Sequence, residues 1–140
     1  MDRIETVARE IVDAAVKVHK RTGPGLLESV YEVLLARELE RRGLTVERQR
    51  PVDVVIDGVQ FNEAFRLDLL VEGLIVVEIK SVETFVPAHW KQVHTYIRLL
   101  DLRLGFLLNF GDATMKSGIH RIVNRYVGRF APSCLRAKTM

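Results

Sequence analysis

The sequence predicts a single α/β domain in which helices pack against a small mixed sheet. Hydrophobic residues recur at helical spacing in residues 4–20 and 26–42, and the period changes to two between residues 44 and 80. A nearly all-apolar segment, 104–110, follows a further helical stretch and is typical of a strand covered on both faces. A length of 140 residues suits one domain with a real core.

The first two helices are separated by Gly23-Pro24-Gly25, which interrupts the helical pattern. Gly43 is the expected C-terminal cap of the second helix. The short connection predicts that the two helices pack together. The residues expected on the inner face of the second helix are Leu27, Val30, Tyr31, Leu34, Leu35 and Leu39.

The strands are expected in pairs. Pro51 is expected to break or shift the pairing of the first strand region, and Asp57-Gly58 is a strong hairpin signal. Two further strands, 65–71 and 74–80, precede a helix over 88–101. After the strand at 104–110, a weaker strand over 119–123 is expected to flank the sheet. Without the weaker strand over 119–123, the expected order is α-α-β-β-β-β-α-β, with four strands before the third helix.

Composition excludes several classes of protein. Hydrophobic residues make up 48% and charged residues 28%, which excludes a disordered chain, a collagen-like repeat and a disulfide-built miniprotein. Cys134 is the single cysteine and has no partner for an internal disulfide. Because the sequence has no basic-then-apolar leader and no apolar run long enough for a bilayer, we expect a cytoplasmic protein that does not enter membranes.

Charge is distributed unevenly within the net value of +3. Residues 1–70 hold 11 Lys and Arg against 13 Asp and Glu, whereas residues 71–140 hold 10 against 5. A basic end indicates either a surface that faces phosphates or a solvated tail. We accordingly divide the chain into a domain over 1–128 and a basic C-terminal tail over 129–140.

The hairpin over residues 65–80 permits two registers. A two-residue loop would place Asp68 and Glu78 on opposite faces, each of them mixed in polarity. A three-residue loop, 72–74, pairs Asp68 with Glu78 and Arg66 with Lys80, and leaves the other face entirely apolar. Because a slip of one residue turns every side chain to the other face, burial favours the second register. Two carboxylates and a lysine then share one face.

Adjacent carboxylates repel each other unless a positive charge lies between them. One interpretation is a divalent cation: Asp68 and Glu78 offer the hard oxygen ligands that suit Mg²⁺, and Lys80 would orient or deprotonate an attacking water. The alternative is a salt-bridge cluster in which Arg66 and Lys80 neutralise the two acids. The spacing of His89 and His94 disfavours a zinc site.

The sequence also resembles a known family. The resemblance rests on Gly25-x-x-Glu28-x-x-Tyr31, Arg66-Leu67-Asp68, Glu78-Ile79-Lys80 and Asn109-Phe110-Gly111. Together these motifs resemble the GxxExxY protein family, which is grouped with the PD-(D/E)XK nuclease superfamily. The resemblance spans roughly residues 4 to 125. It implies a restriction-endonuclease-like α-β-β-β-α-β core, a mixed sheet flanked by helices, with the first helix as an addition.

The resemblance implies roles for particular residues. Asp68 and Glu78 resemble the metal-binding acids, and the carbonyl of Ile79 resembles the backbone ligand. Lys80 resembles the catalytic lysine, and Glu28 resembles a helical acid that completes the metal site in some branches.

A second motif lies in the helix that follows the hairpin. Gln92 and Tyr96 resemble the Gln-x-x-x-Tyr helix of RecB-like nucleases and would position a phosphate or the lysine, although polar contacts at the sheet are an equal alternative. Arg66 and Tyr31 are expected to support the site, and Tyr31 is also open to a purely structural hydrogen bond with Glu28.

The implied function is Mg²⁺- or Mn²⁺-dependent hydrolysis of nucleic acid, DNA rather than RNA. A homodimer would supply the two sites needed to cut both strands. The alternatives are a catalytically inactive nucleic-acid-binding module and a protein-interaction scaffold on the same fold.

Overall fold

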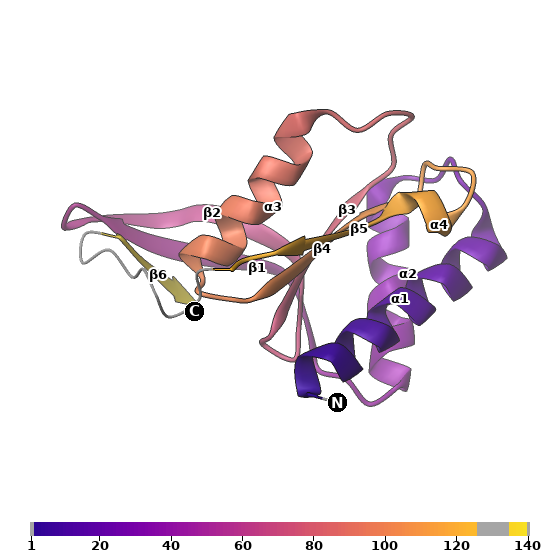
Figure 1. Cartoon of the computed structure of the whole chain (residues 1–140), viewed down its shortest axis with the longest axis horizontal. Coiled ribbons are helices and arrows are strands. Elements are labelled where there is room, and N and C mark those ends of the chain that lie inside the picture. The colour runs from indigo at the N-terminus through magenta and orange to yellow at the C-terminus, as the bar shows by residue number, and fades with distance from the viewer. Residues whose placement is uncertain (1, 126–134, 140) are drawn as a thin grey trace.

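The computed structural model describes residues 2–125 and 135–139, and its strands form one six-stranded sheet in the order β5-β4-β3-β2-β1-β6 (Figure 1). The elements are α1 (Arg3–Thr22), α2 (Glu28–Arg41), β1 (Val46–Ile56), β2 (Val59–Val71), β3 (Ile75–Lys80), α3 (Pro87–Leu99), β4 (Leu104–Asn109), α4 (Met115–Gly118), β5 (Ile119–Val123) and β6 (Leu135–Thr139). From α2 to β4 the order is α-β-β-β-α-β, which confirms the predicted core with α1 added in front.

Helices cover both faces of the sheet, so the domain has two cores (Figure 1). α1 and α2 pack on one face, against residues such as Leu69 and Val77. α3 packs on the other face, where Val93 and Ile97 meet Leu70 and Val76. All six residues of β4 are buried, because this strand pairs with β3 on one side and β5 on the other and is covered above and below. The prediction for 104–110 is confirmed.

Both long helices end at a glycine in the left-handed region, as the sequence predicts. The φ angle is 73° at Gly23 after α1 and 85° at Gly43 after α2. The inner face predicted for α2 is correct for Tyr31, Leu35 and Leu39 but wrong for Leu27, which is 74% exposed, and for Val30. Leu27 is the extended residue before the first turn, and Val30 is rotated about 100° from Tyr31 around the helix.

The first strand region is one strand, β1, rather than two. Asp57-Gly58 forms the predicted hairpin turn to β2, with both residues at positive φ. Pro51 does not break the pairing and stands opposite Arg66; the register shifts between Val52 and Val54 instead.

Part of the segment 129–140 belongs to the sheet. β6 pairs antiparallel with the end of β1, from Val52 with Thr139 to Ile56 with Leu135. The rest of the expected tail, apart from these residues, lies outside the part of the chain that the structure describes. No helix within residues 2–125 is long and apolar enough to cross a membrane.

Candidate functional site

The hairpin between β2 and β3 has the register expected from the burial pattern. Leu70 pairs with Val76 and Val71 with Ile75, which leaves residues 72–74 as a three-residue loop. Glu72 and Gly73 adopt positive φ in this loop. Val76 faces α3, and alternation along β3 places Glu78 on that same face.

The ladder between the two strands ends at Leu69 and Val77, so the expected ladder pairs of Asp68 with Glu78 and of Arg66 with Lys80 are wrong. Beyond these residues, hydrogen bonds to the side chains of the two acids replace the hydrogen bonds between the two backbones. The Asp68 N–H donates to Glu78 Oε1 at 3.2 Å, and the Ile79 N–H donates to Asp68 Oδ2 at 2.8 Å. The two acids therefore meet across a split in the sheet, each held by a backbone group of the opposite strand.

The electrostatics of this pair are unusual. The Glu78 residue is 4% exposed, and burial together with the negative charge of Asp68 raises its pKa to about 9. The nearby charge of Lys80 works in the opposite direction but does not offset the other two effects. The pair thus holds a proton at neutral pH.

The salt-bridge alternative is not what the structure shows. Arg66 binds Glu63, at 3.1 Å, and is exposed. Lys80 is half-buried and forms no ion pair with either acid, although its charge reaches Glu78. Leu67 also departs from the expected apolar face, because it packs in the α3 core rather than beside Leu69.

Tyr96 lies on α3 near the acids, and Gln92 precedes it by one turn of the same helix. The pKa of Tyr96 is raised by burial and by the negative charge of Glu78, with a smaller contribution from Asp68, while a hydrogen bond with Gln92 lowers it. Tyr96 stacks on Phe65 of β2, with ring centroids 4.2 Å apart. The helix thus brings Tyr96 near the split in the sheet, and Gln92 is linked to Tyr96.

Glu28 approaches the same region from α2. Its Oε2 accepts a hydrogen bond from the Ser81 N–H at 3.2 Å, directly after the end of β3, and Ser81 Oγ donates to the Leu26 carbonyl at 2.8 Å. Within the described chain, no group of three or more His, Cys, Asp and Glu side chains is arranged to hold a metal ion. Glu28 therefore flanks the Asp68–Glu78 pair without joining it.

Tyr31 has a structural position. It is fully buried, its hydroxyl donates to the Gly23 carbonyl at 2.5 Å and accepts from the Leu26 N–H at 3.1 Å. Its ring stacks on Phe110 with the centroids 4.5 Å apart. These contacts fix the loop between α1 and α2, which places the first turn of α2 and therefore Glu28. The hydrogen bond expected between Tyr31 and Glu28 is replaced by these loop contacts.

Two polar side chains that no sequence motif predicted, Gln49 and Glu32, are linked to Asp68. Gln49 Nε2 lies 3.5 Å from Asp68 Oδ1 and 2.5 Å from Glu32 Oε1. Glu32 is buried on α2, one turn after Glu28. The i, i+4 spacing of the two glutamates is a signal that could have identified Glu32, but no pattern in the sequence distinguishes Gln49.

Asn109 is the last residue of β4 and explains the role of the Asn-Phe-Gly motif. Its amide group accepts from the N–H groups of Val82 and Gly111 and donates to the Val82 carbonyl and to Asp112. A Cβ atom at Gly111 would lie 2.5 Å from the Val82 carbonyl oxygen, so only glycine fits there. The motif fixes the chain directly after β3, next to Lys80 and Ser81.

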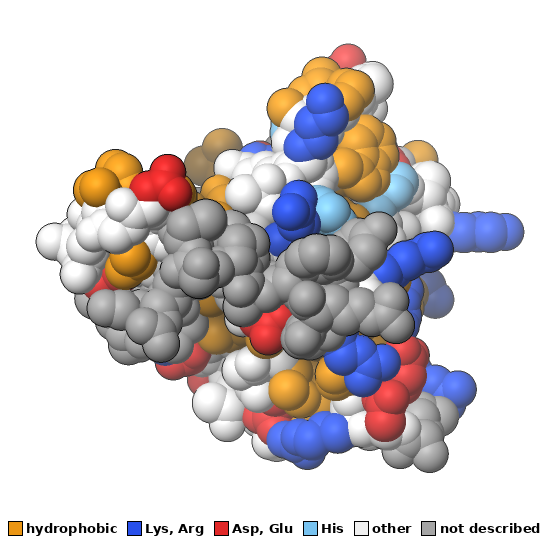
Figure 2. All heavy atoms as spheres, turned by 60° about the vertical axis from the view of Figure 1, so that its left-hand side comes forward, with side chains coloured by type: hydrophobic (Ala, Val, Ile, Leu, Met, Phe, Trp, Pro, Cys, Tyr) orange, Lys and Arg blue, Asp and Glu red, His pale blue; other side chains and the backbone are white. Residues whose placement is uncertain are grey.

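The surface away from the Asp68–Glu78 pair is mixed in charge. Figure 2 shows Lys, Arg, Asp and Glu side chains interspersed on one face, with hydrophobic and His side chains gathered where α3 begins. Arg121, part of the predicted basic end, forms an ion pair with Glu5 of α1.

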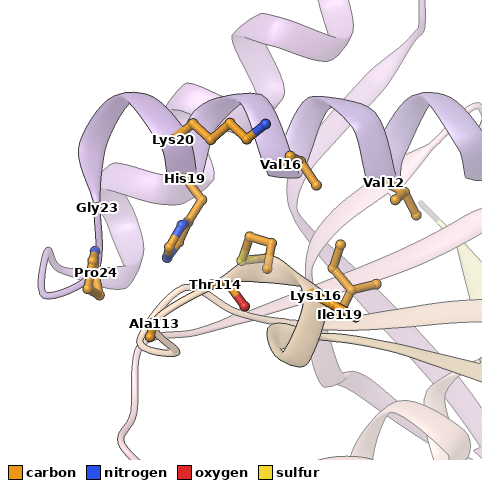
Figure 3. A pocket seen from close by; sticks show the side chains of 11 residues that line it. Val12, Val16, His19, Lys20, Gly23, Pro24, Ala113, Thr114, Lys116 and Ile119 are labelled. Atoms are coloured by element: carbon orange, nitrogen blue, oxygen red, sulfur yellow. The ribbon is translucent and has the colours of Figure 1, made fainter.

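A cavity of about 690 Å³ lies between α1 and the segment around α4 (Figure 3). It is mostly apolar, with His19, Lys20 and Lys116 on its wall, and none of the predicted site residues lines it.

Comparison with protein families gives a match that identifies the fold. A family model of the PD-(D/E)XK nuclease superfamily matches residues 5–122. Searches of curated proteins and of solved structures give no match. The match includes both strands that carry the acids, the helix with Gln92 and the predicted core from α2 to β4. The chain therefore belongs to the PD-(D/E)XK nuclease superfamily.

Proposed function

We propose that this protein hydrolyses phosphodiester bonds of nucleic acid, DNA in preference to RNA, with a bound Mg²⁺ or Mn²⁺ ion. The observation that carries the proposal is the pair formed by Asp68 and Glu78: two carboxyl groups in contact, one of them buried with its pKa raised to about 9. Such an arrangement costs stability, and a divalent cation between the acids would offset that cost.

The donor atoms fit the cation. Mg²⁺ in proteins is commonly held by one or two carboxylates and keeps several water ligands, so a site with two acids is sufficient. The N–H and C=O of one strand residue point to the same edge of the strand, so the Ile79 carbonyl is directed to the Asp68 side, like its N–H. Asp68, Glu78 and the Ile79 carbonyl are the proposed ligands. Glu28 is proposed as a further acid once it leaves the Ser81 N–H.

The remaining side chains act on water and phosphate. When bound, the divalent ion lowers the pKa of a water ligand and offsets charge on the phosphate. Lys80, free of ion pairs with the two acids, would orient the attacking water or stabilise the negative charge that develops. Gln92 would hold a phosphate oxygen, and Tyr96 would orient Gln92 through their hydrogen bond. The Gly25, Glu28 and Tyr31 motif supports the further proposal that the chain belongs to the GxxExxY branch.

The test is cleavage of labelled single- and double-stranded DNA and RNA, in Mg²⁺ or Mn²⁺ and in EDTA. We expect cleavage that requires the metal and that Asp68→Asn and Lys80→Met abolish. Arg66→Met is the matched control, since this cation lies two residues from Asp68 but pairs with Glu63. Cleavage that persists in the Asp68 and Lys80 variants would refute the proposal.

A binding module without catalysis is the second candidate, favoured by a separate groove. The groove, of about 950 Å³, lies between the β1–β2 hairpin and α3, and Gln92 and Tyr96 are among its lining residues. Phe61 and Phe65 line it, and the Phe65–Tyr96 stack offers a flat surface of the kind that binds unpaired bases. Binding of labelled oligonucleotides that survives EDTA, weakens steeply with salt and is unaffected by Asp68→Asn would support this candidate over hydrolysis.

A further inference from the structure

Gln49 is an exposed strand residue with an unusual backbone. Its φ angle is 51°, in the left-handed region that residues other than glycine seldom adopt. It lies between Arg48, which pairs with Leu69, and Arg50, which pairs with Leu67, so it stands opposite Asp68. Because Gln49 is exposed, packing in the core does not impose this conformation. The contacts of its side chain give a reason for it.

The left-handed conformation lets two neighbouring residues reach one acid. In a regular strand, Arg48 and Gln49 would point to opposite faces. Here the guanidinium of Arg48 donates to Glu32 Oε2, at 3.2 and 3.0 Å, and the Gln49 amide donates to Glu32 Oε1 at 2.5 Å. Glu32 is 6% exposed, so these donors satisfy a carboxylate that is out of water.

The same amide group reaches Asp68. Gln49 Nε2 carries two hydrogens, and its two partners, Glu32 Oε1 and Asp68 Oδ1, are both carboxylate oxygens. This fixes the orientation of the amide, because its oxygen could not face either partner. The other oxygen of Asp68, Oδ2, accepts from the Ile79 N–H. Both oxygens of Asp68 are therefore oriented, one by β3 and one by Gln49.

We propose that Gln49 is a positioning residue for Asp68 and that buried Glu32, held by Arg48, is its anchor. The inference rests on the proposed metal-dependent function, in which Asp68 is a ligand. Groups that hydrogen-bond a metal-ligating carboxylate orient it before the metal arrives. In this chain the orienting contact links α2, β1 and β2 at the split in the sheet, and the left-handed backbone of Gln49 makes that link.

The decisive variant is Gln49→Gly, because glycine accepts the left-handed backbone and removes only the side-chain contacts. Glu63→Gly is the matched control: Glu63 also lies in a strand with φ of 49°, but its N–H binds Asp53, away from the acids. We expect Gln49→Gly to weaken Mn²⁺ binding, measured by calorimetry, by about 10–100-fold. Glu32→Gln should weaken it in the same direction, and Glu63→Gly should leave it unchanged.

A second readout needs no metal. If Gln49 holds Asp68, then Gln49→Gly should free the carboxylate and speed hydrogen exchange of the Ile79 amide, whereas Glu63→Gly should not. Unchanged Mn²⁺ affinity and unchanged Ile79 exchange in Gln49→Gly would overturn the inference. If the wild-type protein binds no Mn²⁺, the proposed function fails, and Ile79 exchange alone then decides whether Gln49 positions Asp68.

Discussion

Two buried glutamates of this protein have opposite electrostatic environments. Glu38 on α2 and Glu78 on β3 are 5% and 4% exposed. Arg42 Nε lies 2.9 Å and Lys17 Nζ 3.3 Å from Glu38 Oε2, and the hydrogen bond from Arg42 is the main cause that lowers the pKa of Glu38. Glu78 has Asp68 as its neighbour, and burial together with that carboxyl group raises its pKa.

The difference distinguishes a glutamate with a structural role, Glu38, from a glutamate of the candidate site, Glu78. Glu38 is stabilised by cations from its own helix and from α1, so its negative charge is already compensated in the folded protein. Glu78 is desolvated next to a second acid, and Lys80 offsets this only in part. A fold that carries such a pair is less stable than it would be with neutral side chains, and strongly perturbed carboxyls of this kind concentrate at functional sites. The pair at the split in the sheet is where a ligand has most to stabilise.

The largest contrast is expected in catalysis. Glu78→Gln keeps the size of the side chain but removes the charge that a cation needs, so metal-dependent cleavage should fall on the order of 100-fold or more. Glu38→Gln should cleave like the wild-type protein at a temperature where both are folded. Rates on one labelled substrate in Mn²⁺ measure this. Equal losses in the two variants would mean that the loss reflects folding rather than the site.

The second contrast is the pH dependence of stability without metal. The pKa of Glu78 is about 9 in the folded protein and 4.5 as its ordinary value. Between these values the unfolded chain has lost a proton that the folded chain keeps, so the free energy of unfolding should fall as pH rises from about 4.5 to 9. Each pKa unit corresponds to about 1.4 kcal/mol, so the total fall is several kcal/mol.

The lowered pKa of Glu38 acts at the other end of the scale: its stabilisation is present above its ordinary pKa and is lost as pH falls below it. Urea unfolding in EDTA, over a series from about pH 5 to about pH 9, should show the alkaline decline in the wild-type protein and not in Glu78→Gln. A decline of equal size in both would assign it to another group.

Adding metal should offset the loss of stability caused by the charge of Glu78. A ligand that binds only the folded state at about 100 times its dissociation constant stabilises it by about 2.7 kcal/mol. For a domain of this size we expect a rise in Tm on the order of 10 °C in Mn²⁺. The rise should be absent in Asp68→Asn and in Glu78→Gln, and present in Glu38→Gln. A rise that persists without both site acids would place the metal elsewhere.

The parts of the structure that depend on neighbouring residues could be predicted from the sequence. Alternation along 65–80 was enough to select the hairpin register, and Gly23 and Gly43 were enough to end two helices. Contacts between distant segments could not be predicted. The ladder ends at Leu69 and Val77 because side chains of Asp68 and Glu78 replace its hydrogen bonds, which no local pattern indicates.

β6 is an intermediate case. Leu135, Ala137 and Thr139 alternate with Arg136 and Lys138, a pattern typical of a strand. The positive charge of the segment led to its interpretation as a tail. Its pairing partner, the end of β1, lies some 80 residues earlier in the chain, as in the pair of Val54 with Ala137. The alternation therefore indicates a strand but not where in the sheet it belongs.

The smallest expected effect concerns Glu38, whose charge is stabilised by its neighbours. Glu38→Gln removes the charge that Arg42 and Lys17 share, and hydrogen bonds to charged groups contribute about 1.5–3 kcal/mol each. Arg42 keeps ion pairs with Glu10 and Asp13, so the net loss in unfolding free energy should be near the lower end, about 1–2 kcal/mol at neutral pH. Glu40→Gln, an exposed change on the same helix, is the control and should have almost no effect.

Since Glu78→Gln should stabilise the metal-free protein under the same conditions, one chemical substitution at two equally buried glutamates should shift the free energy of unfolding in opposite directions. Shifts of the same sign would mean that burial, rather than the charge of the neighbour, governs both residues.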